Sequence, residues 1–260
     1  MTANAQLDSL NDIGRRLNAV LVSIQAPPLH DSAWIGPFEQ LVGATFSLIE
    51  SEKRGFSQLV YSPVYHRTVQ CKIASVLAKL DVGTSSEQQD ALDNWLSRYY
   101  FNSGIQRLSF AAERLIATFA SIPCKCGNRP PEIAIKNNQP PRFPERLKGA
   151  QDRLAHVRAE SSEPLGRFDN VLNQLATRYE RDDPFDPVKG LAMIRQDVNS
   201  RKHSVYRRSE CLEVFQRPIS GLITWSTAGF KARMDTGTNC LELVAYAYAE
   251  MLQWQPNAKS

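Results

Sequence analysis

The densest basic stretch of the chain, residues 195–208, could carry chemistry on a phosphodiester. It holds four arginines, one lysine and His203, which is one of only four histidines in 260 residues. If the stretch begins as a helix, Arg195, Asn199 and His203 stand at positions i, i+4 and i+8 and share one face. A guanidinium holds phosphate with a planar fork, and an imidazole can transfer a proton near neutral pH without a metal. These three residues are the candidate catalytic set.

The same stretch also fits a purely structural interpretation. Cations near the end of a helix complement the helix dipole, and a basic face in contact with solvent is common. His203 would then be a capping residue, and His30, His66 and His156 would be surface or half-buried residues. The residue types alone leave both interpretations open.

The candidate residues need a helix to position them, and the apolar spacing predicts one from Pro187 onward. Asp186 precedes it as a cap, and proline is favoured at the first helical position. Its buried stripe would consist of Val188, Leu191, Ile194 and Val198. Steps of three and four residues predict further helices over residues 7–24, 37–52, 66–80, 145–160, 164–181 and 239–254.

The longest helix is expected after a capping sequence at residues 84–87 and runs to Ile122. Its apolar residues are spread widely enough to contact neighbours on more than one side, and Gly104 is expected at a close helix contact. The six prolines of residues 123–145 predict an irregular connection, and residues 236–239 are expected to form a turn within a mixed segment, 217–239.

These patterns predict an all-α helical bundle with a long central helix. We divide it into an N-terminal helical extension, residues 1–85, and a bundle domain, residues 86–260. The net charge of +4 is too balanced to indicate a disordered polyelectrolyte. The sequence lacks the ~20 consecutive apolar residues that a membrane span needs, so a soluble cytoplasmic protein is expected.

The cysteines predict reduced thiols and no metal site. Five cysteines, at positions 71, 124, 126, 211 and 240, are an odd number at irregular spacing. Only Cys124 and Cys126 are close enough to chelate, and structural zinc normally takes four ligands. His156 with Cys211 or Cys240 would complete a site only by chance of folding. We therefore interpret Cys124 and Cys126 as part of the proline-rich connection.

The sequence lacks the motifs that identify several enzyme classes. It contains no glycine-rich phosphate loop, no H-E-x-x-H and no G-x-S-x-G. Nucleotide-dependent enzymes, zinc proteases and serine hydrolases of the familiar designs are therefore disfavoured, and we expect no cofactor.

Two stretches give the chain a resemblance to the HEPN superfamily. Residues 99–108, with Glu113–Leu115, look like the long family helix that begins with an aromatic residue and asparagine. Residues 195–203 look like the family's Arg-x(4-6)-His motif before a last helix. The resemblance covers about residues 86 to 255. Arg195 and His203 are separated by seven residues, one more than the motif allows, so a degenerate, non-catalytic member is the alternative.

The resemblance implies a helical protein of a toxin or phage-defence system that cleaves RNA without metal or cofactor. Arg195 would bind the scissile phosphate, His203 would assist attack by the ribose 2′-hydroxyl, and Asn199 would position the substrate. Family members usually form this site across a homodimer cleft, and a cognate protein partner is also implied. The alternative is a non-catalytic helical interaction module that binds a protein or nucleic acid partner.

Overall fold

The computed structural model describes residues 3–27, 32–57, 86–121, 142–160, 165–177, 190–204 and 227–254. All regular secondary structure in these ranges is helical, which confirms the predicted all-α bundle. The elements are α1 (Ala3–Ser23), the short 3-10 helix η1 (Ser32–Trp34), α2 (Ile35–Ser57), α4 (Ser86–Ser121), α5 (Phe143–Glu160), α6 (Gly166–Ala176), α7 (Gly190–Ser204) and α9 (Thr227–Trp254).

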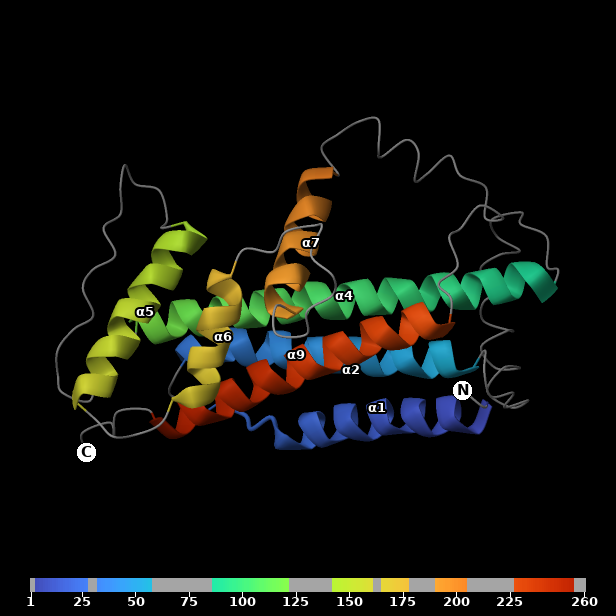
Figure 1. Cartoon of the computed structure of the whole chain (residues 1–260), viewed down its shortest axis with the longest axis horizontal. Helices are drawn as coiled ribbons and strands as arrows, with labels where there is room; N and C mark the ends of the chain where they lie inside the picture. The colour runs from blue at the N-terminus through green and yellow to red at the C-terminus, as the bar shows by residue number, and fades with distance from the viewer. Residues whose placement is uncertain are drawn as a thin grey trace.

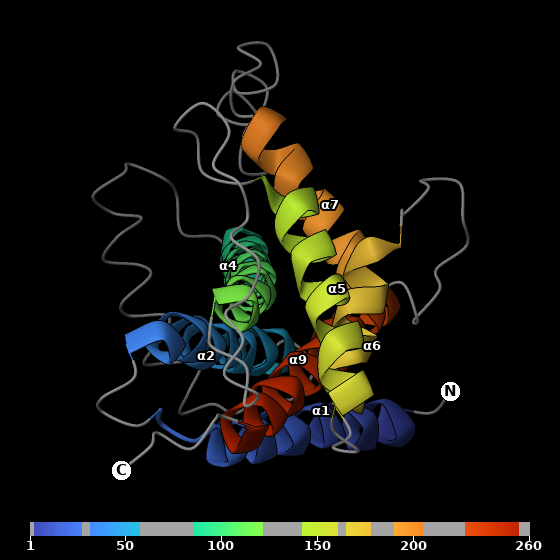
Figure 2. The same ribbon diagram turned by 90° about the vertical axis from the view of Figure 1, so that its left-hand side faces the viewer.

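Helix α4 is the long central helix that the sequence predicts. It spans 36 residues and contacts α2, α5, α7 and α9. Helices α1, α2, α4 and α9 run along the length of the molecule, whereas α5, α6 and α7 cross that direction (Figure 1). In the turned view, α5, α6 and α7 gather on one side of α4, and α2 lies on another (Figure 2).

Helices α2 and α4 pack closely because small residues face each other. A Cβ placed on Gly104 would lie 2.9 Å from Cγ of Leu48 and 3.3 Å from the carbonyl oxygen of Ala44. The hydroxyl of Ser51 donates a hydrogen bond to the carbonyl of Ser97 at 2.8 Å, and the hydroxyl of Ser97 donates one to the carbonyl of Ser51 at 2.9 Å. Gly104 therefore marks a close helix contact, as predicted, between two antiparallel helices.

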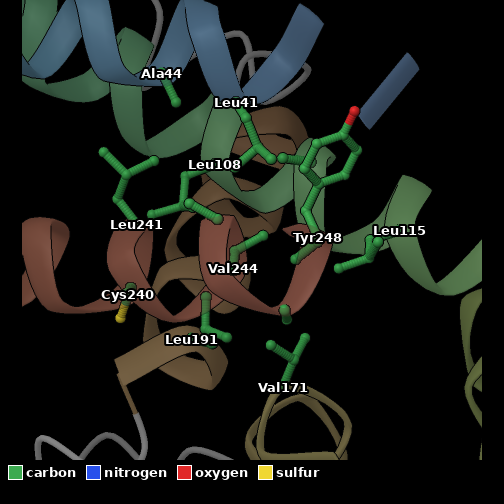
Figure 3. Packing of buried hydrophobic residues seen from close by; sticks show 14 of the residues in the cluster. Leu41, Ala44, Leu108, Leu115, Val171, Leu191, Cys240, Leu241, Val244 and Tyr248 are labelled. Atoms are coloured by element: carbon green, nitrogen blue, oxygen red, sulfur yellow. The ribbon is translucent and has the colours of Figure 1, made fainter. Parts of the chain in front are cut away.

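One hydrophobic cluster joins the helices. Figure 3 shows its centre, where Leu41 of α2, Leu108 of α4 and Val244 of α9 lie together. The rings of Trp34 and Tyr248 meet edge to face, with centroids 6.0 Å apart. Helices α1 and α2 also contribute to this cluster, although they belong to the predicted N-terminal extension. The division into residues 1–85 and 86–260 remains a prediction.

The prediction of a turn at residues 236–239 is wrong, because these residues lie inside α9. The helix begins at Thr227, well before the predicted start at Asn239. Thr236 and Thr238 are buried, and a Cβ on Gly237 would lie 3.2 Å from Cδ1 of Ile105. Small residues thus let α9 approach α4, and burial outweighs their low helix propensity.

Smaller differences concern where helices begin. Pro37 is the third residue of α2 rather than the first, and the first turn tolerates it because those N–H groups have no partner within the helix. Helix α5 begins at Phe143, two residues before the predicted Glu145, whose carboxylate accepts a hydrogen bond from the backbone N–H of Arg142 at 2.9 Å. That side chain stabilises the helix start from its third position.

Some predictions fall outside the described residues. These are the helix over 66–80, the connection that holds Cys124 and Cys126, and the helix start at Asp186 and Pro187. Within the ranges described, no helix is long and apolar enough to cross a membrane.

Candidate functional site

Helix α7 carries all three candidate residues on one continuous helix, as the sequence predicts. It runs from Gly190 to Ser204. Leu191, Ile194 and Val198 are buried against the core, which confirms the predicted apolar stripe for these positions. Gly190 lies so close to α9 that an added Cβ would be 2.7 Å from Sγ of Cys240. The first turns of α7 are therefore fixed by packing.

The side chain of Arg195 contacts two neighbouring helices, α4 and α5. Its Nε donates a hydrogen bond to Oε1 of Glu113 on α4 at 3.2 Å, which is also an ion pair. Its guanidinium carbon lies 3.7 Å from the ring centroid of Phe143, the first residue of α5. The Arg195 side chain is 26% exposed and that of Glu113 is 29% exposed. Arg195 therefore joins α7, α4 and α5 at one partly buried point.

The three candidate residues lie at different positions along the axis of α7. Asn199 is half-buried, one turn beyond Arg195. His203 belongs to the last turn of α7, and its side chain lies outside the described part of the structure. At a rise of ~1.5 Å per residue, its backbone is about 12 Å along the helix from that of Arg195. This end of α7 stands away from the other helices (Figures 1 and 2). Convergence of Arg195 and His203 in one site remains a prediction.

The partners of Arg195 could not be assigned from the sequence. Glu113 precedes it by 82 residues, and Phe143 lies on a different helix again. A carboxylate beside the guanidinium neutralises its charge and opposes the approach of a phosphate. The ring of Phe143 covers one face of the guanidinium, a favourable cation–π arrangement. Both contacts restrict what Arg195 can bind.

The described residues can be searched for metal ligands and for a reactive thiol. No group of three or more His, Cys, Asp or Glu side chains able to hold a metal occurs among the residues that the structure describes. Burial raises the pKa of the Cys240 thiol to about 12. Cys240 therefore stays a neutral thiol and behaves as a core residue, because only the thiolate is nucleophilic.

Comparison of the chain with protein-family models, with curated proteins and with solved structures found no match. The resemblance to the HEPN superfamily accordingly depends on the residues quoted above.

Proposed function

We propose that the protein is a non-catalytic helical module that binds RNA through the basic face of α7. The supporting sequence feature is the run of basic residues from Arg195 to Arg208. The first part of this run, to Ser204, forms a helix whose end stands away from the other helices (Figure 1). Clustered arginine and lysine side chains supply the phosphate contacts that dominate affinity for RNA and DNA.

The contacts of Arg195 support the proposal that the protein is not catalytic. Its guanidinium is paired with Glu113 and stacked on Phe143. A scissile phosphate at Arg195 would have to compete with the carboxylate at 3.2 Å. In a nuclease, the phosphate-binding cation is useful when it is already free and oriented before substrate arrives. Arg195 instead acts as a structural link between three helices.

A metal-independent ribonuclease of HEPN type is the second candidate. One observation favours it: Arg195, Asn199 and His203 lie on one continuous helix, as such a site needs. In this case RNA would displace Glu113 from Arg195, and His203 would move the proton of the attacking 2′-hydroxyl. A second copy of the chain would complete the cleft, and a toxin or phage-defence role would follow.

One experiment separates the two candidates. The purified chain is incubated with labelled single-stranded RNA in excess chelator, and binding and cleavage are measured on the same samples. We expect binding without cleavage. We expect Asn199→Ala and His203→Ala to weaken binding about two- to tenfold each, because each removes a polar group of α7 that can contact RNA. Arg15→Gln, on an exposed position of α1, is the control for loss of a polar contact elsewhere.

Two results would contradict the proposal in different ways. Cleavage in chelator that leaves 2′,3′-cyclic phosphate ends and falls ~10²–10⁴-fold in His203→Ala would establish the ribonuclease. Binding that is unchanged by both α7 substitutions would show that RNA does not contact this helix.

A further inference from the structure

A second basic surface lies where the side chains of α4 pack across α2. Arg107 and Arg114 are both exposed and are seven residues apart on α4. Seven residues bring a helix almost back to the same side, with a difference of about 20° and a separation of ~10.5 Å along the axis. The two guanidiniums therefore form a row parallel to α4.

Two glycines of α2 make room for this row. A Cβ placed on Gly43 would lie 2.8 Å from Nη1 of Arg107, and one on Gly36 would lie 2.9 Å from Nη1 of Arg114. The glycines are also seven residues apart, so each arginine crosses α2 at an equivalent position. Any larger residue at either glycine would push the guanidinium away. The geometry holds both cations at the surface in defined places.

Neither guanidinium is neutralised within the described part of the chain, where no hydrogen bond or ion pair is found for Arg107 or Arg114. This is the opposite of Arg195, which is paired with Glu113. The nearest acidic position on α2 is Glu39, which is exposed and lies between Gly36 and Gly43 on the same side of that helix. Its carboxylate lowers the positive potential of the row without forming an ion pair.

An exposed aromatic ring flanks the arginine row. Phe46 is 53% exposed, and it stands three residues after Gly43, so it lies next to the position that Arg107 crosses. Tyr99, which is 56% exposed on α4, is turned by about 80° from Arg107 and by about 160° from Ser97, which faces α2, so it lies off this surface. Its ring contacts that of Tyr100 edge to face, with centroids 5.6 Å apart. The surface therefore has two cations and one exposed ring, that of Phe46, beside them.

We propose that this α2–α4 surface binds a single strand of RNA, with Arg107 and Arg114 on its phosphates and Phe46 stacked on a base. Free guanidiniums beside exposed rings form the combination that binds single strands, because every base has a face to stack and every linkage has a charge. Helix α7 lies on a different side of α4 (Figure 2). The choice of RNA depends on the proposed function, but the site is separate from α7.

The alternative explanation is that the arginines only cover α2 with their aliphatic stems. Cδ of Arg107 would lie 3.0 Å from a Cβ on Gly43, so the stem does contact the helix. Long basic side chains often bury the stem and keep the charge in water. Methionine preserves most of that stem and removes the charge, so Arg107→Met and Arg114→Met separate packing from phosphate binding.

The test measures binding of a fluorescent 15-nucleotide uridine oligomer to the full chain at several salt concentrations. We expect Arg107→Met with Arg114→Met to weaken binding at least tenfold and to reduce the salt slope by about 1.4, since each phosphate contact on a single strand contributes ~0.7. Phe46→Ala is expected to weaken binding at least about fivefold, the lower limit for one stacked base. A duplex of the same length is expected to bind much more weakly, because its bases are not free to stack.

Two matched variants complete the test. Glu39→Gln is expected to strengthen binding about two- to fivefold, because it removes the negative charge between the two glycines. Lys148→Gln, at an exposed position of α5, is expected to leave affinity unchanged. Circular dichroism and melting temperature show whether each variant folds as the natural chain does.

Photocrosslinking with 5-bromouridine then locates the strand directly. Crosslinks to the peptide that contains Phe46 would support the proposal, and they are expected to persist in His203→Ala. Crosslinks confined to α7, or an unchanged salt slope in the double arginine variant, would overturn it while leaving the proposed role of α7 intact. Crosslinks at the α2–α4 surface without any at α7 would contradict the proposed function of α7 and still support this site.

Discussion

Helix α4 is held to α2 and to α7 by two different kinds of contact. Toward α2 the backbones come close, since Gly104 meets Leu48 and the hydroxyls of Ser51 and Ser97 each bond to the other residue's carbonyl. Toward α7 the contact includes a partly exposed ion pair between Arg195 and Glu113. The first kind depends on the absence of a side chain, and the second depends on charges that water and ligands can reach.

This difference indicates which part of the molecule can respond to a partner. Closely packed helices do not tolerate gradual displacement, because small shifts open voids or force overlaps. A partly exposed ion pair contributes little to stability and can be replaced by another anion. Arg195 can therefore exchange its partner while the first turns of α7 stay packed, whereas Arg107 and Arg114 lie on a layer held by close backbone contact.

The largest effect is expected at the α2–α4 contact. Gly104→Val adds a branched side chain where a single Cβ already lies 2.9 Å from Leu48 and 3.3 Å from a backbone oxygen. Overpacking of this kind costs about 2–3 kcal/mol, and part of the overlap is with backbone that cannot move aside. Urea unfolding of the full chain measures the change.

The matched control is Gly166→Ala, at the first residue of α6. An added Cβ there has no atom within 4 Å, so the substitution is expected to be neutral or to stabilise by less than ~1 kcal/mol. Equal destabilisation by the two substitutions would mean that α2 and α4 are not held by close approach.

A second, pH-dependent effect is expected where α1 meets α2. Burial raises the pKa of Glu52 to about 7, from 4.5, and the Glu52 carboxyl lies against Gly14 of α1. The folded chain holds this proton more tightly than the unfolded chain, so the free energy of unfolding falls as pH rises from about 4.5 through 7. Because the carboxyl keeps partial access to water, we expect about 1–2 kcal/mol.

The comparison for Glu52 is made between variants, because other groups titrate in the same range. Glu52→Gln removes the ionisable group, so its stability relative to the natural chain should increase between pH 5 and pH 8. Glu39→Gln, at an exposed carboxyl of the same helix, should give a curve parallel to that of the natural chain. Parallel curves for both variants would show that the carboxyl of Glu52 is solvated.

The sequence predicts the helices on both sides of this comparison well. Helix α4 was predicted nearly to the residue, because its uninterrupted spacing is bounded by a capping sequence and by Pro123. The buried stripe of α7 was predicted for the same reason. Local periodicity is sufficient for an element whose own residues determine its boundaries.

What the sequence could not predict depends on contacts between distant segments. Residues 236–239 have the composition of a turn, and only the surface of α4 around Ile105 explains why they are helical. Similarly, nothing local selects Glu113 as the partner of Arg195 among 27 acidic residues. The arginine row was missed because the glycines that accommodate it lie on another helix.

The smallest effect is expected at the contact between α4 and α7. A double-mutant cycle with Glu113→Gln and Arg195→Met should give a coupling energy of about 0.5–1 kcal/mol, because both side chains are roughly a quarter exposed. The coupling should decrease at high salt. Glu113→Gln alone should change stability least, because the Arg195 guanidinium keeps its contact with the Phe143 ring.

The same substitution should have a clear effect on binding. Removing the Glu113 carboxylate frees the charge of Arg195, so the affinity of α7 for RNA should rise about two- to fivefold in Glu113→Gln. Arg195→Met should abolish that gain. If coupling instead exceeds ~3 kcal/mol, the ion pair is as fixed as the α2–α4 contact, and α7 cannot exchange Glu113 for a phosphate. If coupling is small and affinity rises, Glu113 is the group that keeps Arg195 from its partner.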